Sequence, residues 1–268
     1  YGGEDADPPQ YGKVFISVDI YNADGVPDAN KAIYYDYIKT KTPLTITPEF
    51  IDPEFTYIDV NSIVRYNVNV TQKQPTEIQT LVQAAINEYS DVHLNNFEST
   101  LRYSQLIRSI DSADTSIVSN ETTIRAIKIL AAPTLVFGVT KSYTIKFDFA
   151  LSKEYYVTGD TFVVSALHSV STTIFTYNNI NCRIVDNAGE LNIVTEQADG
   201  TYLVVKPVGS VDYDTGTITL TDFAPADAFA GKIKFYAIPA IRDITCHRNI
   251  ILRVLEEDIN LTIERVRE

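Results

Sequence analysis

Helical periodicity in this chain of 268 residues is confined to its first half. The clearest case is residues 76–89, where Thr76 and Gln79 fit a capping box that would start a helix. Apolar side chains then recur at intervals of three and four and form one stripe: Ile78, Leu81, Val82, Ala85, Ile86 and Tyr89. Such a stripe has to pack on a sheet or on another helix. The sequence therefore predicts a layered α/β region here.

Strand and helix patterns alternate around that helix. Apolar runs predict strands over 14–20, 57–70 and 115–130, and a short helix is expected around 103–110. A further helix is expected over 28–39, with an apolar face made of Ile33, Tyr34, Tyr37 and Ile38. Right-handed crossovers would arrange this order of elements as an α/β sandwich resembling a split βαβ fold.

Past residue 134 the helical period gives way to short β runs separated by turn residues. The runs cover residues 143–149, 161–167, 180–185, 191–194, 201–206, 217–220 and 232–238. Strands at such spacing predict a mostly antiparallel, β-sandwich-like domain. We therefore expect an α+β protein with an α/β domain over 1–134 and a β-rich domain over 135–268. A strand in the segment 249–267 could add to a neighbouring subunit.

Charge and hydropathy exclude several classes of partner. The chain has 22 Lys and Arg against 35 Asp and Glu, a net charge of −13. Its basic residues are scattered, which argues against a non-specific nucleic-acid binder and against a basic membrane-surface patch. Its apolar runs are shorter than the ~18–20 residues of a membrane span. We expect neither nucleic acid nor membrane as a partner.

Residues that could carry chemistry are dispersed. His93, His168 and His247 lie in separate segments, outside any recognisable nucleophile, phosphate or metal motif. Cys182 and Cys246 are too few for a disulfide framework, and we expect buried thiols, although pairing or a zinc site stays open. The sequence thus predicts no catalytic residues, no cofactor and no metal.

Carboxylates and tyrosines offer weaker signals. Asp212 with Asp214, or residues 256–258, could pair for acid–base chemistry or bind calcium, although Asp beside a hairpin turn is usually solvated. The chain has 17 Tyr, 12 Phe and no Trp, and Tyr is enriched in protein interfaces. Candidate contact residues are Tyr34, Tyr35, Tyr37, Tyr155 and Tyr156. Tyrosines that merely cap the edges of the core are the alternative.

The first 18 residues carry the most specific pattern. Its distinctive positions are Gly2, Gly3, Glu4, Asp5, Pro8, Tyr11 and Gly12. The glycines permit tight turns and close approach, and the prolines at 8 and 9 stiffen the chain. The stretch resembles the segment leading into the first strand of the α/β domain in baseplate wedge proteins of T4-like contractile-tailed phages, and more loosely in the J-like baseplate family. The helix near 76, the strand near 123–129 and the hairpin over 208–220 are also similar to that family.

The resemblance implies a structural role in the virion. In that family two copies of the wedge protein join a larger wedge protein, and wedges close into a ring around the hub that changes shape on tail contraction. The chain would be a C-terminal portion of such a protein. It would form homo-oligomers, as dimers and within the ring, and bind other wedge proteins in a baseplate assembled in the host cytoplasm. The family offers no catalytic residues.

Two other functions stay open on the sequence. A Tyr-rich β-sandwich with acidic loops could be an adhesin-like module that binds a glycan or calcium. Paired carboxylates about 5–10 Å apart in one cleft would instead indicate a hydrolase.

Overall fold

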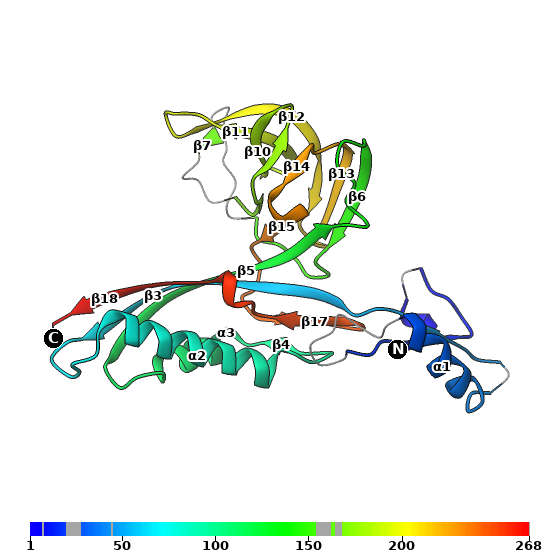
Figure 1. The fold of residues 1–268 in the computed structure, drawn as a ribbon, viewed down its shortest axis with the longest axis horizontal. Coiled ribbons are helices and arrows are strands. Elements are labelled where there is room, and N and C mark those ends of the chain that lie inside the picture. Colours follow the sequence, from blue (N-terminus) through cyan, green and yellow to red (C-terminus); the bar gives the residue numbers. More distant parts are fainter. Residues whose placement is uncertain (7, 20–27, 44, 154–161, 164–167, 268) are drawn as a thin grey trace.

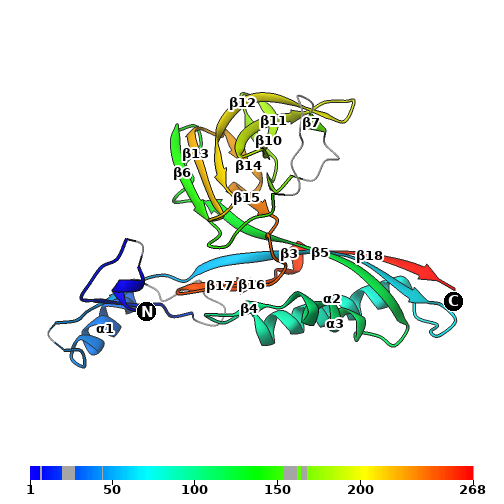
Figure 2. The ribbon, with the colours of Figure 1, turned by 180° about the vertical axis from the view of Figure 1, so that it is seen from behind.

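An elongated body and a lobe of strands above its middle make up the molecule in this computed structural model (Figure 1). The structure describes residues 1–268 except 7, 20–27, 44, 154–161, 164–167 and 268. We call residues 1–131 and 244–266 the body, and residues 141–237 the upper lobe. The view from behind shows the same two parts (Figure 2).

The body is built on two long antiparallel strands, β3 (Glu54–Asn67) and β5 (Ile117–Ala131), with Val60 opposite Ile124. Their alternating apolar residues point to one buried face. Two helices cover that face, α2 (Pro75–His93) against β18 and α3 (Tyr103–Asp111) against β5. None of the helices in the described part of the chain is both long and apolar enough to span a bilayer.

The predicted stripe on α2 is confirmed at Ile78, Val82, Ile86 and Tyr89, which are buried, whereas Leu81 and Ala85 are half-buried. The predicted cap is wrong by two residues. Gln74 is the N-cap, and its backbone N–H donates to Glu77 Oε2 at 2.7 Å. The helix starts at Pro75, since proline has no N–H to lose in the first turn and its fixed φ suits that position.

The α+β class is confirmed, but the split βαβ arrangement is wrong. β1 (Lys13–Ile16) pairs in parallel with β2 (Thr47–Phe50) in a separate two-stranded sheet, and α1 (Asp28–Lys39) connects them. β3 and β5 are direct antiparallel neighbours. The connection between them contains two helices, α2 and α3, and it brings the chain back to the end of the sheet where β3 finishes. There the Asn67 N–H donates to the Ser116 carbonyl at 2.9 Å.

The upper lobe is one hydrogen-bonded path of antiparallel strands in the order β15-β8-β10-β11-β12-β13-β6. Its strands are β6 (Lys141–Lys146), β7 (Phe162–Val163), β8 (Val170–Thr172), β9 (Phe175–Tyr177), β10 (Ile180–Asn187), β11 (Glu190–Glu196), β12 (Thr201–Asp212), β13 (Thr217–Phe223), β14 (Asp227–Ala228) and β15 (Lys232–Ala237). The predicted antiparallel character is confirmed. The path curls on itself rather than forming two separate sheets (Figure 1). Of the predicted strand over 161–167, only β7 lies within the described residues.

The C-terminal segment returns to the body. β17 (Ile250–Arg253) and β18 (Ile259–Val266) both pair in parallel with β3, on the side away from β5, although the sequence assigned this segment to the β-rich domain. The strand that could have added to a neighbour thus pairs within its own chain, because Ile259, Leu261 and Ile263 pack against the core that α2 covers. A short ladder of β4 (Thr100–Leu101) with β16 (Ile244–Thr245) ties the helical layer to this segment. The division into folding domains stays a prediction.

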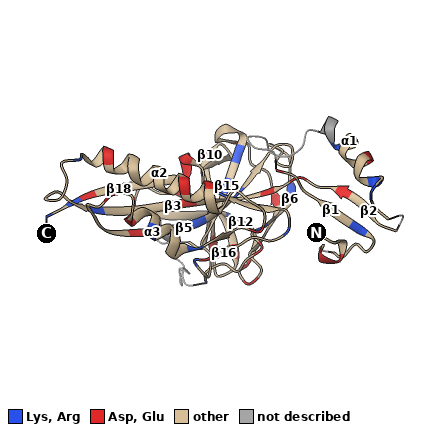
Figure 3. Ribbon diagram, turned by 90° about the horizontal axis from the view of Figure 1, so that it is seen from below, with Lys and Arg blue, Asp and Glu red and all other residues tan. Residues whose placement is uncertain are grey.

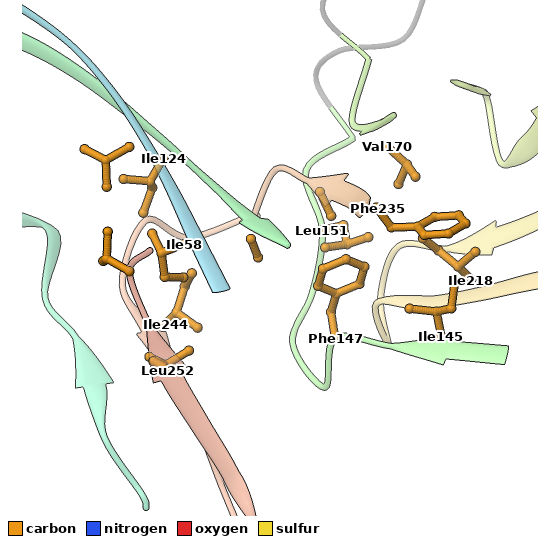
Figure 4. Packing of buried hydrophobic residues seen from close by; sticks show 14 of the residues in the cluster. Ile58, Ile124, Ile145, Phe147, Leu151, Val170, Ile218, Phe235, Ile244 and Leu252 are labelled. Atoms are coloured by element: carbon orange, nitrogen blue, oxygen red, sulfur yellow. The ribbon is translucent and has the colours of Figure 1, made fainter. Parts of the chain in front are cut away.

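One part of the apolar core lies in the body and another lies in the upper lobe (Figure 4). Ile58, Ile124 and Leu252 pack in the body, whereas Phe147 and Phe235 pack in the upper lobe. β5 belongs to both, because its first half pairs with β3 and its second half, from Ala126 to Ala131, pairs with β15. A single continuous strand, β5, therefore joins the body to the upper lobe.

Candidate assembly surfaces

The N-terminal residues form a closed loop clamped onto β1. The backbones of Tyr1 and Phe15 exchange two hydrogen bonds of 2.9 Å. The Gly3 carbonyl accepts from the Gln10 N–H at 2.7 Å, and a Cβ on Gly3 would lie only 1.8 Å from the Gln10 carbonyl oxygen. Gly12 has a φ of +79°, which favours glycine, and its carbonyl accepts from the first residue of β2. Glycine is therefore required at position 3 by close contact.

The other motif residues point outward from this loop. Glu4, Asp5 and Pro8 are exposed, and Tyr11 is 83% exposed. They do not shape the loop through buried contacts, so their role as a family signature stays a prediction.

A cleft of about 1090 Å³ opens between this loop and the lower edge of the upper lobe. Glu4, Glu49, Glu54 and Asp148 line it, against Lys146 and Arg248. Acidic and basic residues are interspersed along the body (Figure 3). Lys13 on β1 binds Glu49 on β2 at 2.6 Å. The surplus of carboxylates gives the cleft a negative potential that suits a basic partner segment.

Helix α1 turns aromatic residues toward solvent. Ile33 and Tyr37 are each 66% exposed and Tyr34 is 46% exposed, and we call these three residues the α1 face. The sequence placed them on one apolar face with Ile38, which is half-buried, and α1 packs on a sheet of only two strands. Tyr35 is half-buried, with Lys39 Nζ 5.6 Å from the centre of its ring. Lys41 Nζ lies 5.9 Å from the ring centre of Tyr37.

Of the candidate contact residues, the structure thus places Tyr34 on an exposed face and Tyr35 beside it. Tyr155 and Tyr156 lie outside the described residues. Tyr37, also a candidate contact in the sequence, lies on the same exposed face. Sequence reasoning did not single out Ile33, although its i, i+4 spacing to Tyr37 marks one helix face.

A second apolar surface lies in the upper lobe. Two hollows of about 570 and 400 Å³ share Ile174 and Asn181, and we call the surface around them the β9–β10 groove. Ile174 is 47% exposed, Ile180 is 42% exposed and Phe229 is 88% exposed. Phe229 protrudes from a tight turn in which Ala230 has a φ of +54°. Sequence analysis missed this surface, and its signal was a large aromatic residue in a turn.

The three histidines do not converge. His93 and His247 are exposed on separate elements, whereas His168 is buried with Nδ1 2.9 Å from the Asp186 carbonyl oxygen. The Asp186 carboxylate accepts from Tyr213 Oη at 2.5 Å and from the Val170 N–H at 2.8 Å. Burial raises the pKa of Asp186, although these donors oppose the shift. The cluster braces β8, β10 and the β12–β13 turn inside the lobe.

The remaining candidates for chemistry have structural roles. Cys182 and Cys246 are free, buried thiols in different lobes, and burial raises the pKa of Cys246 to about 12. Asp212 accepts from the Asp214 N–H at 3.0 Å in the hairpin turn, and Asp214 binds Lys153 at 2.7 Å. In the part of the chain that the structure describes, no three His, Cys, Asp or Glu side chains group as metal ligands would.

The central part of the body matches a known domain family. Residues 54–128, which span β3, α2, α3 and most of β5, match the C-terminal domain III of baseplate structural protein gp6. The chain is also similar to baseplate wedge protein gp6 of Enterobacteria phage T4, with 26% identity over 93 residues. That match covers 35% of this chain and 14% of the T4 protein. By both comparisons, part of this chain is similar to structural proteins of the phage baseplate wedge.

Proposed function

We propose that the chain is a structural part of the baseplate wedge that self-associates, binds other wedge proteins and helps to close the ring around the hub. The observation that carries the proposal is the family domain over residues 54–128, which forms the spine of the body. β5 extends this spine into the upper lobe. A force on the body or on the upper lobe is therefore transmitted along β5.

Buried charges reinforce the junction between the lobes. Lys234 on β15 binds Asp258 at 2.5 Å and Glu257 at 2.7 Å, in the turn that leads into β18. Beside it, Arg125 Nε donates to Asp59 Oδ2 at 2.8 Å, and its guanidinium lies 4.5 Å from the ring centre of Tyr236. These contacts support a rigid strut in one state, and their rearrangement would let the lobes turn when the tail contracts.

Exposed apolar residues on both lobes support contacts with other subunits. The α1 face lies at one end of the body and the β9–β10 groove lies in the upper lobe. Aromatic residues that stay this exposed are typical of interaction sites.

Sedimentation velocity of the purified chain over a range of micromolar concentrations tests the self-association. We expect the weight-average sedimentation coefficient to rise with concentration. A strictly monomeric chain at the highest concentration would overturn this part of the proposal. The melting temperature measured with and without calcium tests the adhesin-like alternative, because a ligand that binds the native state raises the melting temperature. We expect no shift.

A further inference from the structure

A lysine and two carboxylates meet at the junction between the upper lobe and the body. Lys234 Nζ on β15 lies 2.5 Å from Asp258 Oδ1 and 2.7 Å from Glu257 Oε1. The side chains of Lys234 and Asp258 are only 9% and 4% exposed, whereas that of Glu257 is 55% exposed. An amine, which is a nucleophile when neutral, thus lies against a buried carboxyl group with a second carboxylate beside it.

Hydrogen-bonded backbone fixes both groups. Lys234 lies in the ladder between β15 and β5, and on its other side its N–H donates to Thr173 Oγ1 at 3.0 Å. Asp258 ends one turn of 3₁₀ helix, η3 (Glu256–Asp258), in which its N–H donates to the Leu255 carbonyl at 3.0 Å. Groups that a fold holds in reach of each other can react with effective molarities of about 10⁵–10⁸ M.

The two carboxyl groups lie in opposite environments. Burial raises the pKa of Asp258, and its Oδ2 atom has no hydrogen-bond partner among the residues that the structure describes. The hydrogen bond to Lys234 lowers the pKa of Glu257, so this exposed side chain stays a carboxylate. Neighbouring carboxyl groups whose pKa values are pushed apart suit different roles in a reaction. Asp258 suits the group that is attacked, and Glu257 suits the base that carries a proton.

We infer that Lys234 and Asp258 condense after folding to an isopeptide bond, which joins the upper lobe to the body. A proton passes from the Lys234 ammonium to the Asp258 carboxylate along their hydrogen bond, and the neutral amine attacks Cγ of Asp258. Glu257 takes a second proton from the nitrogen and returns it to an oxygen of the attacked carboxyl group, which leaves as water. The N–C bond forms and the C–O bond breaks, so one ammonium and one carboxylate become one amide and one water molecule.

The balance of charges makes the condensation slow compared with folding. Burial acts to lower the pKa of Lys234, but the hydrogen bonds to Asp258 and Glu257 outweigh it and raise this pKa. The neutral amine is therefore the minor form, and the freshly folded chain holds two separate side chains. The amide is favoured in the end because it replaces two buried charges by an uncharged group.

The bond would act as a covalent tether at the junction. It closes a loop over residues 234–258, which contains β16 and β17. It keeps β15 beside the start of β18 while the neighbouring contacts rearrange. The condensation depends neither on self-association nor on a place in the baseplate.

Mass spectrometry of the intact chain and of its tryptic peptides tests the inference. Condensation lowers the mass by one water. Trypsin does not cut after a modified lysine, so residues 233–242 should stay in one piece and be joined to residues 254–265. Formation of an aspartimide elsewhere in the chain also removes a water, but it yields no joined peptide.

Three variants identify the reacting groups, and circular dichroism checks that each is folded. Lys234→Arg keeps the positive charge but lacks the amine, and Asp258→Ala lacks the carboxyl group, so neither should yield the joined peptide. Lys232→Arg is the matched control, because Lys232 also binds Glu257, at 3.4 Å, but is not held against Asp258. It should yield the joined peptide as the wild-type chain does.

We expect the joined peptide in the folded wild-type chain, in a fraction that rises during incubation, and not in a chain kept unfolded in urea. Glu257→Gln should slow its appearance by about 10²–10⁴-fold, the usual contribution of a general base. A folded wild-type chain that keeps its full mass and yields no joined peptide after a week would overturn the inference, and so would a joined peptide in Lys234→Arg. Either result leaves the proposed function standing, since that function is tested by sedimentation.

Discussion

Lys234 Nζ lies 2.5 Å from Asp258 Oδ1, and this ion pair joins the upper lobe to the C-terminal strand of the body. Both side chains are less than 10% exposed. Burial favours the neutral lysine, but the hydrogen bonds to Asp258 and Glu257 outweigh it and raise the pKa of Lys234. Burial also raises the pKa of Asp258, against the hydrogen bond from Lys234. Removal of one partner leaves the other buried without its counter-charge.

We expect Lys234→Met to lower the free energy of unfolding by about 3–5 kcal/mol, the usual cost of leaving one charge of a buried pair alone. Lys232→Met is the matched control, since the Lys232 side chain is 32% exposed and binds Glu257 at the longer distance of 3.4 Å. It should cost at most ~1 kcal/mol. The double variant Lys234→Met/Asp258→Leu should recover most of the loss. Urea unfolding measures all three, and equal costs for the two lysine variants would contradict the assignment.

Asp114 predicts an acid-sensitive contribution to stability. The Lys73 ammonium and the hydroxyl and N–H of Ser116 hydrogen-bond its carboxylate and lower its pKa from 3.8 to about 2. Because the pKa is lower in the folded chain, the contribution is complete above pH ~5 and is lost progressively as the pH falls toward 2. Urea midpoints of the wild-type chain should fall more steeply over this range than those of Asp114→Asn. Lys73→Met should reduce the slope as well, and three identical slopes would contradict the prediction.

A comparison of alanine substitutions at two glycines distinguishes the cost of backbone strain from the cost of a steric clash. Gly216 has a φ of +67° and Gly138 a φ of +71°, so alanine is strained at both positions. A Cβ on Gly216 would lie 2.1 Å from the Phe149 carbonyl oxygen, whereas one on Gly138 would meet nothing within 4 Å. We expect Gly138→Ala to cost ~1 kcal/mol and Gly216→Ala ~1–3 kcal/mol more in urea unfolding. Equal losses would show that the β12–β13 turn relaxes away from Phe149.

The two cysteines report separately on the two lobes. Cys182 lies on β10 in the upper lobe and Cys246 follows β16 in the body, and burial raises the pKa of both thiols. Alkylation at pH 8 should therefore be slow in the native chain, since the thiolate is the reactive form. With rising urea, labelling at both sites at the same midpoint would indicate one cooperative unit. Labelling at distinct midpoints is what two folding domains predict, and Cys182→Ser and Cys246→Ser assign each signal.

The parts of the fold that sequence reasoning predicted are those with strong local periodicity. The stripe from Ile78 to Tyr89 has a repeat that only a helix on a packed surface satisfies, and it was found at the correct residues. The cap was misplaced because Thr76 fits the Ser/Thr-x-x-Glu/Gln pattern of a capping box, whereas the observed N-cap, Gln74, does not. Pro75 at the first helical position is the signal that marks the true start. The bounds of α1 were also close to those observed.

The rest depends on contacts between residues far apart in the chain. Ile259 pairs with Val60 in parallel, and nothing near either residue specifies the other. The exposure of Ile33 and Tyr37 depends on how little sheet lies beside α1, which the helix itself does not encode. The β9–β10 groove combines Ile174, Ile180 and Phe229 from three separate segments. A single sequence therefore predicted the elements but not the surfaces they make.

The most direct measurement of the central claim is a cryo-electron microscopy map of the assembled baseplate that resolves the positions of this chain. We expect neighbouring copies to touch one another around the hub, with the domain over residues 54–128 unchanged in shape between extended and contracted tails. A map in which no copy contacts another copy or a second wedge protein would contradict the account.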